Sequence, residues 1–388
     1  MSLDSEKTGL IPNSPIHCIS TKEKVGLIAA LFPTIPVMIG TIIRYPFSKN
    51  PSSALRKELI KYFARKMLCQ ITILQTQWVL PTSTEAYVTW IRSRTDVSSE
   101  PSTENFESEG FKIHWIGSQS ARKIILHYPS GGYAMPLHKG HFDMLNSFRK
   151  KLEPKTDVKL AVLEYALTPY ATYPTQFRQA VLALNHILSS GASPNDILLF
   201  GDSAGGLLLL QVIAHILHPY PTIPPLPQLS SPFLGLLFIS PWVTFGSSST
   251  PPTSKRNLDY LNHTILTIWG DAAKKGSALE LTKPNHGQLC EPGGYWGEPM
   301  KAPSEWWNGV EKISTNILIT SGDWEFLHND IQEFGKSFKQ AVAPRGVKIN
   351  VLGEPNGVHM GPVFEKLWDF APNTLTDVVI DWVYERII

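Results

Sequence analysis

Residues 197–213 read ILLFGDSAGGLLLLQVI, and the predicted fold is organised around this stretch. Four apolar residues that end at Gly201 predict a strand buried on both faces. The apolar run after Gly206 continues for about three turns and predicts a buried helix. Between them lies Gly-x-Ser-x-Gly, formed by Gly201, Ser203 and Gly205. A strand, a sharp turn that carries serine and a helix are the context that a nucleophile elbow requires.

The residue types at this turn suit a nucleophilic serine. Ser203 must stand on a sharp turn for its hydroxyl to project from the backbone, and side chains at positions 201 and 205 would collide there. The helix after Ser203 directs its free amides and positive end at the place where an oxyanion would form. The alternative is a glycine-rich turn that only joins a strand to a helix, because this motif also occurs by chance. The flanking strand and helix favour the elbow.

The composition is typical of a large globular protein. The chain has 388 residues, of which 43% are hydrophobic and 18% charged, enough for one large α/β domain or two smaller ones. A net charge of +2 and the lack of a Lys/Arg run give no reason to expect a nucleic-acid partner. Three scattered cysteines argue against a disulfide framework and fit a reducing compartment, and no Cys/His spacing resembles a zinc site. We therefore expect an intracellular protein without a metal.

Strand and helix patterns alternate along most of the chain, which predicts an α/β fold with a mostly parallel sheet and helices on both sides. Residues 96–109, rich in Ser and Glu, are expected to form a loop. Residues 243–310, rich in Ser, Pro, Gly and Trp, are expected to form an inserted lid with one helical piece near 257–269. The expected strands cover 111–116, 123–128, 158–165, 197–200, 233–242, 316–320 and 347–352, and the expected helices cover 53–74, 175–188 and 374–387.

The first 110 residues are predicted to form a separate region of apolar segment and cap helices, ahead of a catalytic domain over 111–388. Residues 25–43 contain no charged residue and could just span a bilayer. Pro33 and Pro36 interrupt this segment and favour two short helices that lie against the protein or a membrane surface. The segment lacks the cleavage site of a signal peptide. A lid-forming helix pair, a membrane-surface anchor and a true span all stay open. We expect an intracellular protein, either cytoplasmic or peripherally associated with a membrane.

Further candidate site residues follow other predicted strands. Gly131 and Gly132 come after the strand over 123–128, and paired glycines let backbone amides face a ligand, although a simple turn is the alternative. An acid near 323–325 follows the strand over 316–320, and His359 follows the last strand. The order serine, acid, histidine and the placement at the ligand-binding edge of an open α/β sheet predict a catalytic triad.

At this point the sequence resembles the α/β-hydrolase superfamily, specifically the hormone-sensitive-lipase-like esterases, over about residues 111–388. The N-terminal apolar segment and the insert are similar to those of fungal members that process esters in lipid or secondary metabolism. Five segments carry the resemblance: the elbow at 201–206, Tyr-x-Leu-x-Pro at 165–169, Ile-Ser-Pro-Trp at 239–242, Ser-Gly-Gly-Tyr at 130–133, and His359.

The resemblance implies an oxyanion hole formed by the amides of Gly131, Gly132 and Ala204. The family's loop begins with His-Gly, and this chain has Pro129 and Ser130 at those places. Losing one oxyanion donor would cost about 2.7–4 kcal/mol of transition-state stabilisation, so a distorted loop would reduce activity strongly.

The acid of the triad has two candidates. Alignment on Leu327 and Asp330 places Glu325 in the family's acid position, whereas counting from the end of the strand favours Asp323. We prefer Glu325, because glutamate can hold the histidine in the required tautomer. Asp202, beside the nucleophile, is expected to order the elbow.

Together these residues predict a serine hydrolase that cleaves a carboxylic ester of a small or lipid-like apolar substrate, with no metal or organic cofactor. Two alternatives remain: transfer of the acyl group to an acceptor other than water, and a non-catalytic ligand receptor on the same fold. A receptor tends to lose the histidine, and His359 is present. The oligomeric state is not predicted.

Overall fold

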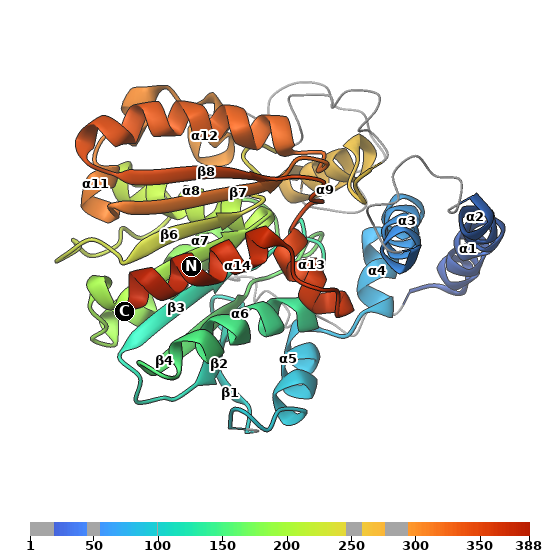
Figure 1. Ribbon diagram of the computed structural model, residues 1–388, viewed down its shortest axis with the longest axis horizontal. Coiled ribbons are helices and arrows are strands. Elements are labelled where there is room, and N and C mark those ends of the chain that lie inside the picture. The colour runs from blue at the N-terminus through green and yellow to red at the C-terminus, as the bar shows by residue number, and fades with distance from the viewer. Residues whose placement is uncertain (1–18, 45–54, 99, 246–257, 276–293) are drawn as a thin grey trace, which may run out of the picture.

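The computed structural model describes residues 19–44, 55–98, 100–245, 258–275 and 294–388. The predictions for 246–257 and 276–293, which are parts of the insert at 243–310, lie outside the described residues. Figure 1 shows a central sheet between two layers of helices, with a small group of N-terminal helices projecting to one side.

In the described part of the chain, the sheet has eight strands in the order β1-β2-β4-β3-β5-β6-β7-β8. The pairs β1–β2 and β2–β4 are antiparallel, and the strands from β4 to β8 are parallel. The seven predicted strands are all present, so the predicted α/β-hydrolase sheet is confirmed. The strands are β1 (Ser102–Phe106), β2 (Phe111–Gly117), β3 (Lys123–Tyr128), β4 (Val158–Glu164), β5 (Ile197–Asp202), β6 (Gly235–Ile239), β7 (Asn316–Gly322) and β8 (Lys348–Glu354).

The expectation of a loop over 96–109 is wrong for β1. This edge strand pairs with β2, and every second side chain points to solvent, which explains its polar sequence STENF. A half-exposed edge strand can take Ser and Glu without loss of core packing. β1 therefore belongs to the sheet, although it precedes the predicted domain boundary at residue 110.

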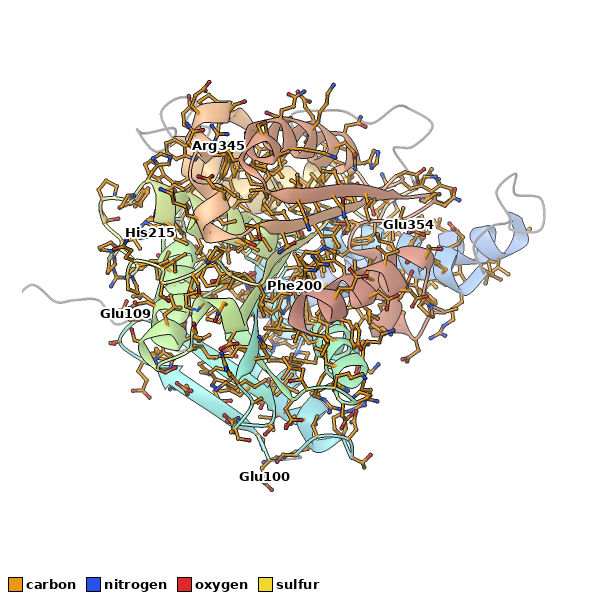
Figure 2. All side chains as sticks on the ribbon, turned by 60° about the vertical axis from the view of Figure 1, so that its left-hand side comes forward. Glu100, Glu109, Phe200, His215, Arg345 and Glu354 are labelled. Carbon is orange, nitrogen blue, oxygen red and sulfur yellow. The ribbon has the colours of Figure 1, made fainter. Side chains whose placement is uncertain are left out.

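Helices cover both faces of the sheet (Figure 1). On one face, α5, α6 and α14 pack through residues such as Trp90, Phe142 and Trp382. On the other face, α7, α8 and α12 pack through residues such as Phe177 and Phe334. The strands between the two layers are apolar on both faces, and Phe200 of β5 lies in the interior (Figure 2). The helices of these layers are α5 (Ser83–Arg92), α6 (Lys139–Leu152), α7 (Thr175–Ser189), α8 (Ala204–Leu217), α12 (His328–Val342), α13 (Gly361–Trp368) and α14 (Thr374–Ile387).

The insert contributes α9 (His263–Lys275) and α10 (Gly294–Gly297) among its described residues, and α11 (Val310–Ile313) begins at its last residue. The ring of Trp269 in α9 lies directly on Gly132, and a side chain at position 132 would overlap it. Trp269 of the insert therefore lies over the glycine loop after β3.

Ahead of α5, the described part of the N-terminal region contains four helices beside the main body: α1 (Thr21–Leu31), α2 (Thr34–Arg44), α3 (Leu55–Gln70) and α4 (Ile73–Val79). As predicted, the apolar segment is divided at Pro33, and Pro36 is tolerated in the first turn of α2. Among the described residues, Thr21–Gly40 is the one helical stretch long and apolar enough to cross a membrane, and 12% of its most apolar window is buried within the protein.

Candidate active site

The backbone of the elbow explains the two glycines around Ser203. Ser203 has φ 51° and ψ −116°, a conformation that L-residues rarely adopt. A methyl group at Gly205 would overlap the carbonyl oxygen of Tyr128, and one at Gly201 would overlap Gly205 itself. Close contact between β3, β5 and the first turn of α8 thus requires glycine at both places.

The elbow is also tied to the next strand. The Ser203 amide donates to Ile239 O at 3.0 Å, and the Trp242 amide donates to Ser203 O at 2.8 Å. These bonds hold the strained residue between β5 and the loop after β6, so the position of the serine is fixed by two strands.

The structure brings Ser203, His359 and Glu325 together. His359 Nε2 lies 2.8 Å from Ser203 Oγ, and His359 Nδ1 lies 3.5 Å from Glu325 Oε1. All three side chains are buried. A carboxylate beside Nδ1 favours the tautomer with the proton on Nδ1, which leaves Nε2 to accept the serine proton.

Of the two candidate acids, only Glu325 approaches the imidazole. Its second oxygen, Oε2, accepts hydrogen bonds from Ser240 Oγ at 2.6 Å and from the Gly322 amide at 2.7 Å. Asp323 Oδ1 instead accepts from the Asn356 amide at 2.6 Å. The geometry therefore favours Glu325 as the partner of His359 and gives Asp323 a role in the loop after β8.

The predicted oxyanion donors lie in two elements at the same edge of the sheet. Gly131 and Gly132 have φ of 110° and 59°, and they form the turn after β3. Ala204 is the first residue of α8, where amides have no partner within the helix. The phenol of Tyr133 donates to Ala204 O at 3.2 Å and so connects the two elements.

Two residues of the insert that sequence reasoning missed hold the histidine loop. Asp259 accepts hydrogen bonds from the amides of Tyr260, His359 and Phe326, at 2.9, 3.2 and 2.9 Å. The Tyr260 hydroxyl donates to His359 O at 2.9 Å. Asp259 thus joins the loop of the base to the loop of the acid. The sequence predicts a helical piece near 257–269, but α9 begins only at His263, and no motif pointed to the bonds that Asp259 and Tyr260 make.

Ser240 is a further missed residue. It has φ 48°, donates to Glu325 and accepts from the Met360 amide at 3.0 Å. It therefore fixes the acid against the residue after His359. Its place within Ile-Ser-Pro-Trp at 239–242 was a usable signal, because that segment carried part of the family resemblance.

Burial raises the pKa of Asp259 to about 6, while nearby His359 and the amide donors pull it down. Burial also raises the pKa of Tyr260 well above its usual value, so its hydroxyl stays protonated as a donor. The carboxylate of Asp259 is therefore costly to ionise, although it is ionised at neutral pH.

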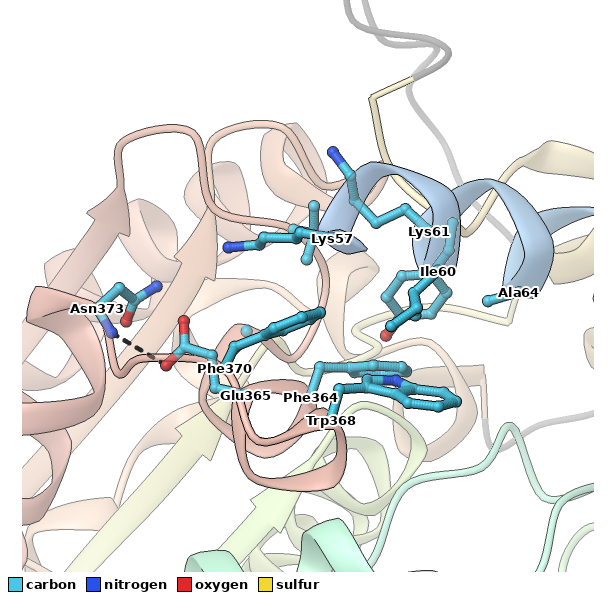
Figure 3. A pocket seen from close by; sticks show the side chains of 12 residues that line it. Lys57, Ile60, Lys61, Ala64, Phe364, Glu365, Trp368, Phe370 and Asn373 are labelled. Atoms are coloured by element: carbon cyan, nitrogen blue, oxygen red, sulfur yellow. Dashed lines mark hydrogen bonds between the residues drawn. The ribbon is translucent and has the colours of Figure 1, made fainter. Parts of the chain in front are cut away.

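A small apolar hollow lies between α3 and α13, next to the histidine loop. Figure 3 shows Phe364, Trp368 and Phe370 on one side and the amines of Lys57 and Lys61 on the other. Val358 and Gly361 also line it, but Ser203, Glu325 and His359 do not. The hollow therefore borders the loop and is not the space above the nucleophile. Within the described residues, no group of three or more His, Cys, Asp or Glu side chains could hold a metal ion.

The profile of the steryl acetyl hydrolase family matches residues 102–370, from the start of β1 to just beyond α13. The chain belongs to the steryl acetyl hydrolase family. Steryl acetyl hydrolase 1 of Saccharomyces cerevisiae is 24% identical over 255 residues, which are 62% of this chain and 54% of the yeast protein. An acetyl-hydrolase of Streptomyces hygroscopicus is 23% identical over 239 residues, 61% of this chain and 68% of that protein. The match thus spans about half of the yeast relative.

Solved structures agree with the fold of this steryl acetyl hydrolase family member. A hormone-sensitive-lipase homologue from a metagenome library has a TM-score of 0.60 at 18% identity and covers 85% of this chain and 98% of its own. A carboxyl esterase of the fungus Tuber melanosporum has a TM-score of 0.58 at 15% identity, covering 76% and 87%. The family match and the shared fold confirm the predicted relation to the hormone-sensitive-lipase-like α/β-hydrolases.

The raised pKa of Asp259 predicts a pH-dependent stability. Between about pH 4 and pH 6 the folded chain keeps a proton that the unfolded chain has released, so the free energy of unfolding falls as the pH rises through this window. The loss is on the order of 2–3 kcal/mol and is complete above pH 6. Asp259→Asn removes this contribution, so urea unfolding at pH 4 and pH 7 should show a smaller change in the variant. Asp157→Asn, at an exposed position, is the control; the same pH dependence in wild type and Asp259→Asn would refute the assignment.

Proposed function

We propose that this chain hydrolyses the acetyl ester of an apolar alcohol through Ser203, His359 and Glu325. The observation that carries the proposal is the 2.8 Å contact between His359 Nε2 and the hydroxyl of a serine in a strained elbow conformation. The family name, and the names of the yeast and Streptomyces relatives, support acetate as the acyl group.

In the proposed reaction, His359 takes the proton of Ser203 Oγ while the oxygen attacks the ester carbonyl. Glu325 stabilises the imidazolium that forms and holds its ring. His359 then gives the proton to the departing alcohol, which leaves an acetyl-serine. Water, deprotonated by the same imidazole, attacks the acetyl-serine and releases acetate and the free Ser203.

The oxyanion of each tetrahedral intermediate needs preorganised donors. In the proposal these are the amides of Gly131, Gly132 and Ala204, which belong to the turn after β3 and to the first turn of α8. The positive end of α8 points to the same place and favours the developing negative charge. Trp269 lies on Gly132 and keeps water from one side of this loop.

Two alternatives to hydrolysis use the same fold. A non-catalytic receptor is disfavoured, because a binding site has no need for a histidine within hydrogen-bond distance of a strained serine. Transfer of the acetyl group to an alcohol, amine or carbon would use the same acyl-enzyme. Release of free acetate would indicate hydrolysis, whereas formation of a new acetyl conjugate would indicate transfer to another acceptor.

We predict that purified protein turns over p-nitrophenyl acetate and releases acetate. Ser203→Ala and His359→Ala should lower kcat by about 10⁴–10⁶-fold, because each removes a group that the others depend on. Glu325→Gln should lower kcat by roughly 10³–10⁴-fold, because the amide no longer stabilises the imidazolium. Steady-state rates at pH 7.5 measure these effects.

Asp323→Asn is the matched control, since it changes a carboxylate in the same loop that does not approach the imidazole. It should keep at least about a third of the activity. Equal rates for wild type and Ser203→Ala would refute the proposal. A greater loss of kcat in Asp323→Asn than in Glu325→Gln would identify Asp323 as the acid.

We also propose that α1 and α2 bind the surface of a membrane. Eight large apolar side chains on these helices and the turn between them are 41–74% exposed, which is far more than a protein in water normally leaves uncovered. They are Val25, Ile28, Phe32, Ile35, Val37, Ile39, Ile42 and Ile43.

The surroundings of these helices support an interfacial position over a span. Gln75 of α4 donates to Glu23 O at 2.7 Å, and Leu27 is buried, so α1 is attached to the body. Lys24 lies over the exposed ring of Trp78, a residue type enriched at the membrane interface. α3 adds five basic residues against one acidic one, which favours lipids with negative headgroups.

Vesicle flotation tests this membrane proposal. Wild-type protein should float with vesicles that contain about 30% phosphatidylserine and should bind pure phosphatidylcholine more weakly, because basic residues near the surface attract anionic lipid. Phe32→Asp should reduce the floated fraction at least roughly tenfold, because it places a charge among the inserted side chains.

Val378→Asp is the matched control, because Val378 is an exposed valine on α14, away from these helices. It should float like the wild type. Absence of wild-type flotation, or equal loss in both variants, would contradict the proposal. Resistance of membrane-bound protein to a carbonate wash would instead indicate a span.

A further inference from the structure

A buried polar cluster lies behind the elbow and takes no part in the proposed chemistry. It consists of Ser130, His141, Asp202 and His127, each at most 5% exposed. These residues come from the turn after β3, from α6, from the end of β5 and from β3. Buried polar groups cost free energy unless they are paired, so a cluster of four beside a catalytic serine calls for a role.

The hydrogen bonds fix the tautomer of His141. The His138 amide donates to His141 Nδ1 at 3.2 Å, so Nδ1 carries no proton. Nε2 must then carry the proton of the neutral ring, and it donates to Ser130 Oγ at 2.6 Å. Burial lowers the pKa of His141 well below its usual value, and neighbouring His138 lowers it further, so the ring stays neutral. His141 is therefore a fixed donor to Ser130 and cannot act as its base.

Asp202 extends the cluster to the nucleophile. Its Oδ1 lies 2.5 Å from His127 Nε2, and its Oδ2 lies 3.6 Å from His141 Nε2. The ring of His127 stacks on Phe200 with 4.4 Å between centroids, which holds it against β5. Because Asp202 directly precedes Ser203, the cluster connects the turn after β3 to the elbow.

The backbone at Pro129 and Ser130 is also held by Tyr165. The hydroxyl of Tyr165 lies 2.8 Å from Ser130 O and 3.0 Å from Pro129 O. The next two residues, Gly131 and Gly132, have positive φ and carry no side chain that could anchor them. Contacts at Ser130 therefore restrain the glycine amides from the N-terminal side of the turn, as the bond from the Tyr133 hydroxyl to Ala204 O does from the other side.

We propose that Ser130 and His141 are positioning residues that aim the Gly131 and Gly132 amides at the oxyanion. The anchor of the loop is the 2.6 Å bond between Ser130 Oγ and His141 Nε2 of α6. The inference rests on the proposed function, because an oxyanion hole is meaningful only for acyl transfer. It assigns neither residue a contact with the substrate.

Three variants test the proposal with p-nitrophenyl acetate. His141→Phe and Ser130→Ala each remove the Ser130–His141 hydrogen bond and should lower kcat roughly 10- to 100-fold with KM nearly unchanged, because misaimed donors weaken binding of the transition state only. His141→Gln can still donate to Ser130 Oγ and should recover most of the activity. The double variant Ser130→Ala with His141→Phe should be no slower than the slower single variant.

A boronic acid that forms a tetrahedral adduct with Ser203 gives a second measure. Its inhibition constant should rise in His141→Phe by about the same factor as kcat falls. His114→Phe is the matched control, because His114 is another fully buried histidine, 2.7 Å from Glu164, on a strand separated from β3 by β4. It should lower the urea midpoint and leave kcat and boronate affinity within about twofold.

Equal losses of kcat in His141→Phe and His114→Phe, or a rise in KM without a fall in kcat, would overturn the positioning role. A wild-type protein without turnover would instead refute the proposed hydrolysis. In that case boronate binding still decides the inference, and equal affinities of wild type and His141→Phe would overturn it.

Discussion

The structure depends on one strained residue. Ser203 holds a positive φ between β5 and α8, and this conformation is stable only because two glycines allow the backbones to meet. The burial of apolar side chains between α8 and the sheet stabilises the fold and offsets the free-energy cost of the strained conformation at Ser203. The strain turns the hydroxyl out of the backbone, and the amides at the start of α8 face the same place.

The groups around this serine come from loops that follow parallel strands, and parallel strands end at one edge of the sheet. Convergence at an edge is not sufficient for catalysis, since the acid and the base must also keep a common geometry. Asp259 and Tyr260 provide that restraint by binding both loops, and Ser240 adds a direct bond to Glu325. α3 approaches the same segment, with Arg65 3.4 Å from Asp259 O. The N-terminal helices are thereby linked to the histidine loop.

The sequence predicts the parts of this arrangement that depend on local pattern. Apolar runs predict the seven strands, and Gly-x-Ser-x-Gly predicts the elbow, because burial and steric contact select those residue types. β1 was missed because an edge strand needs no apolar run. Asp259 was missed because two of its three bonds are to backbone amides more than sixty residues away, which leave no trace in spacing. The sequence left Glu325 and Asp323 as alternatives for the acid, because only the three-dimensional structure shows which carboxylate approaches His359.

A crystal structure of the protein after reaction with a small alkyl fluorophosphonate tests the central claim most directly. The account predicts phosphorus bonded to Ser203 Oγ, with the phosphoryl oxygen about 2.7–3.1 Å from the amides of Gly131, Gly132 and Ala204. Phosphorus on another residue, or a phosphoryl oxygen turned away from all three amides, would contradict the account.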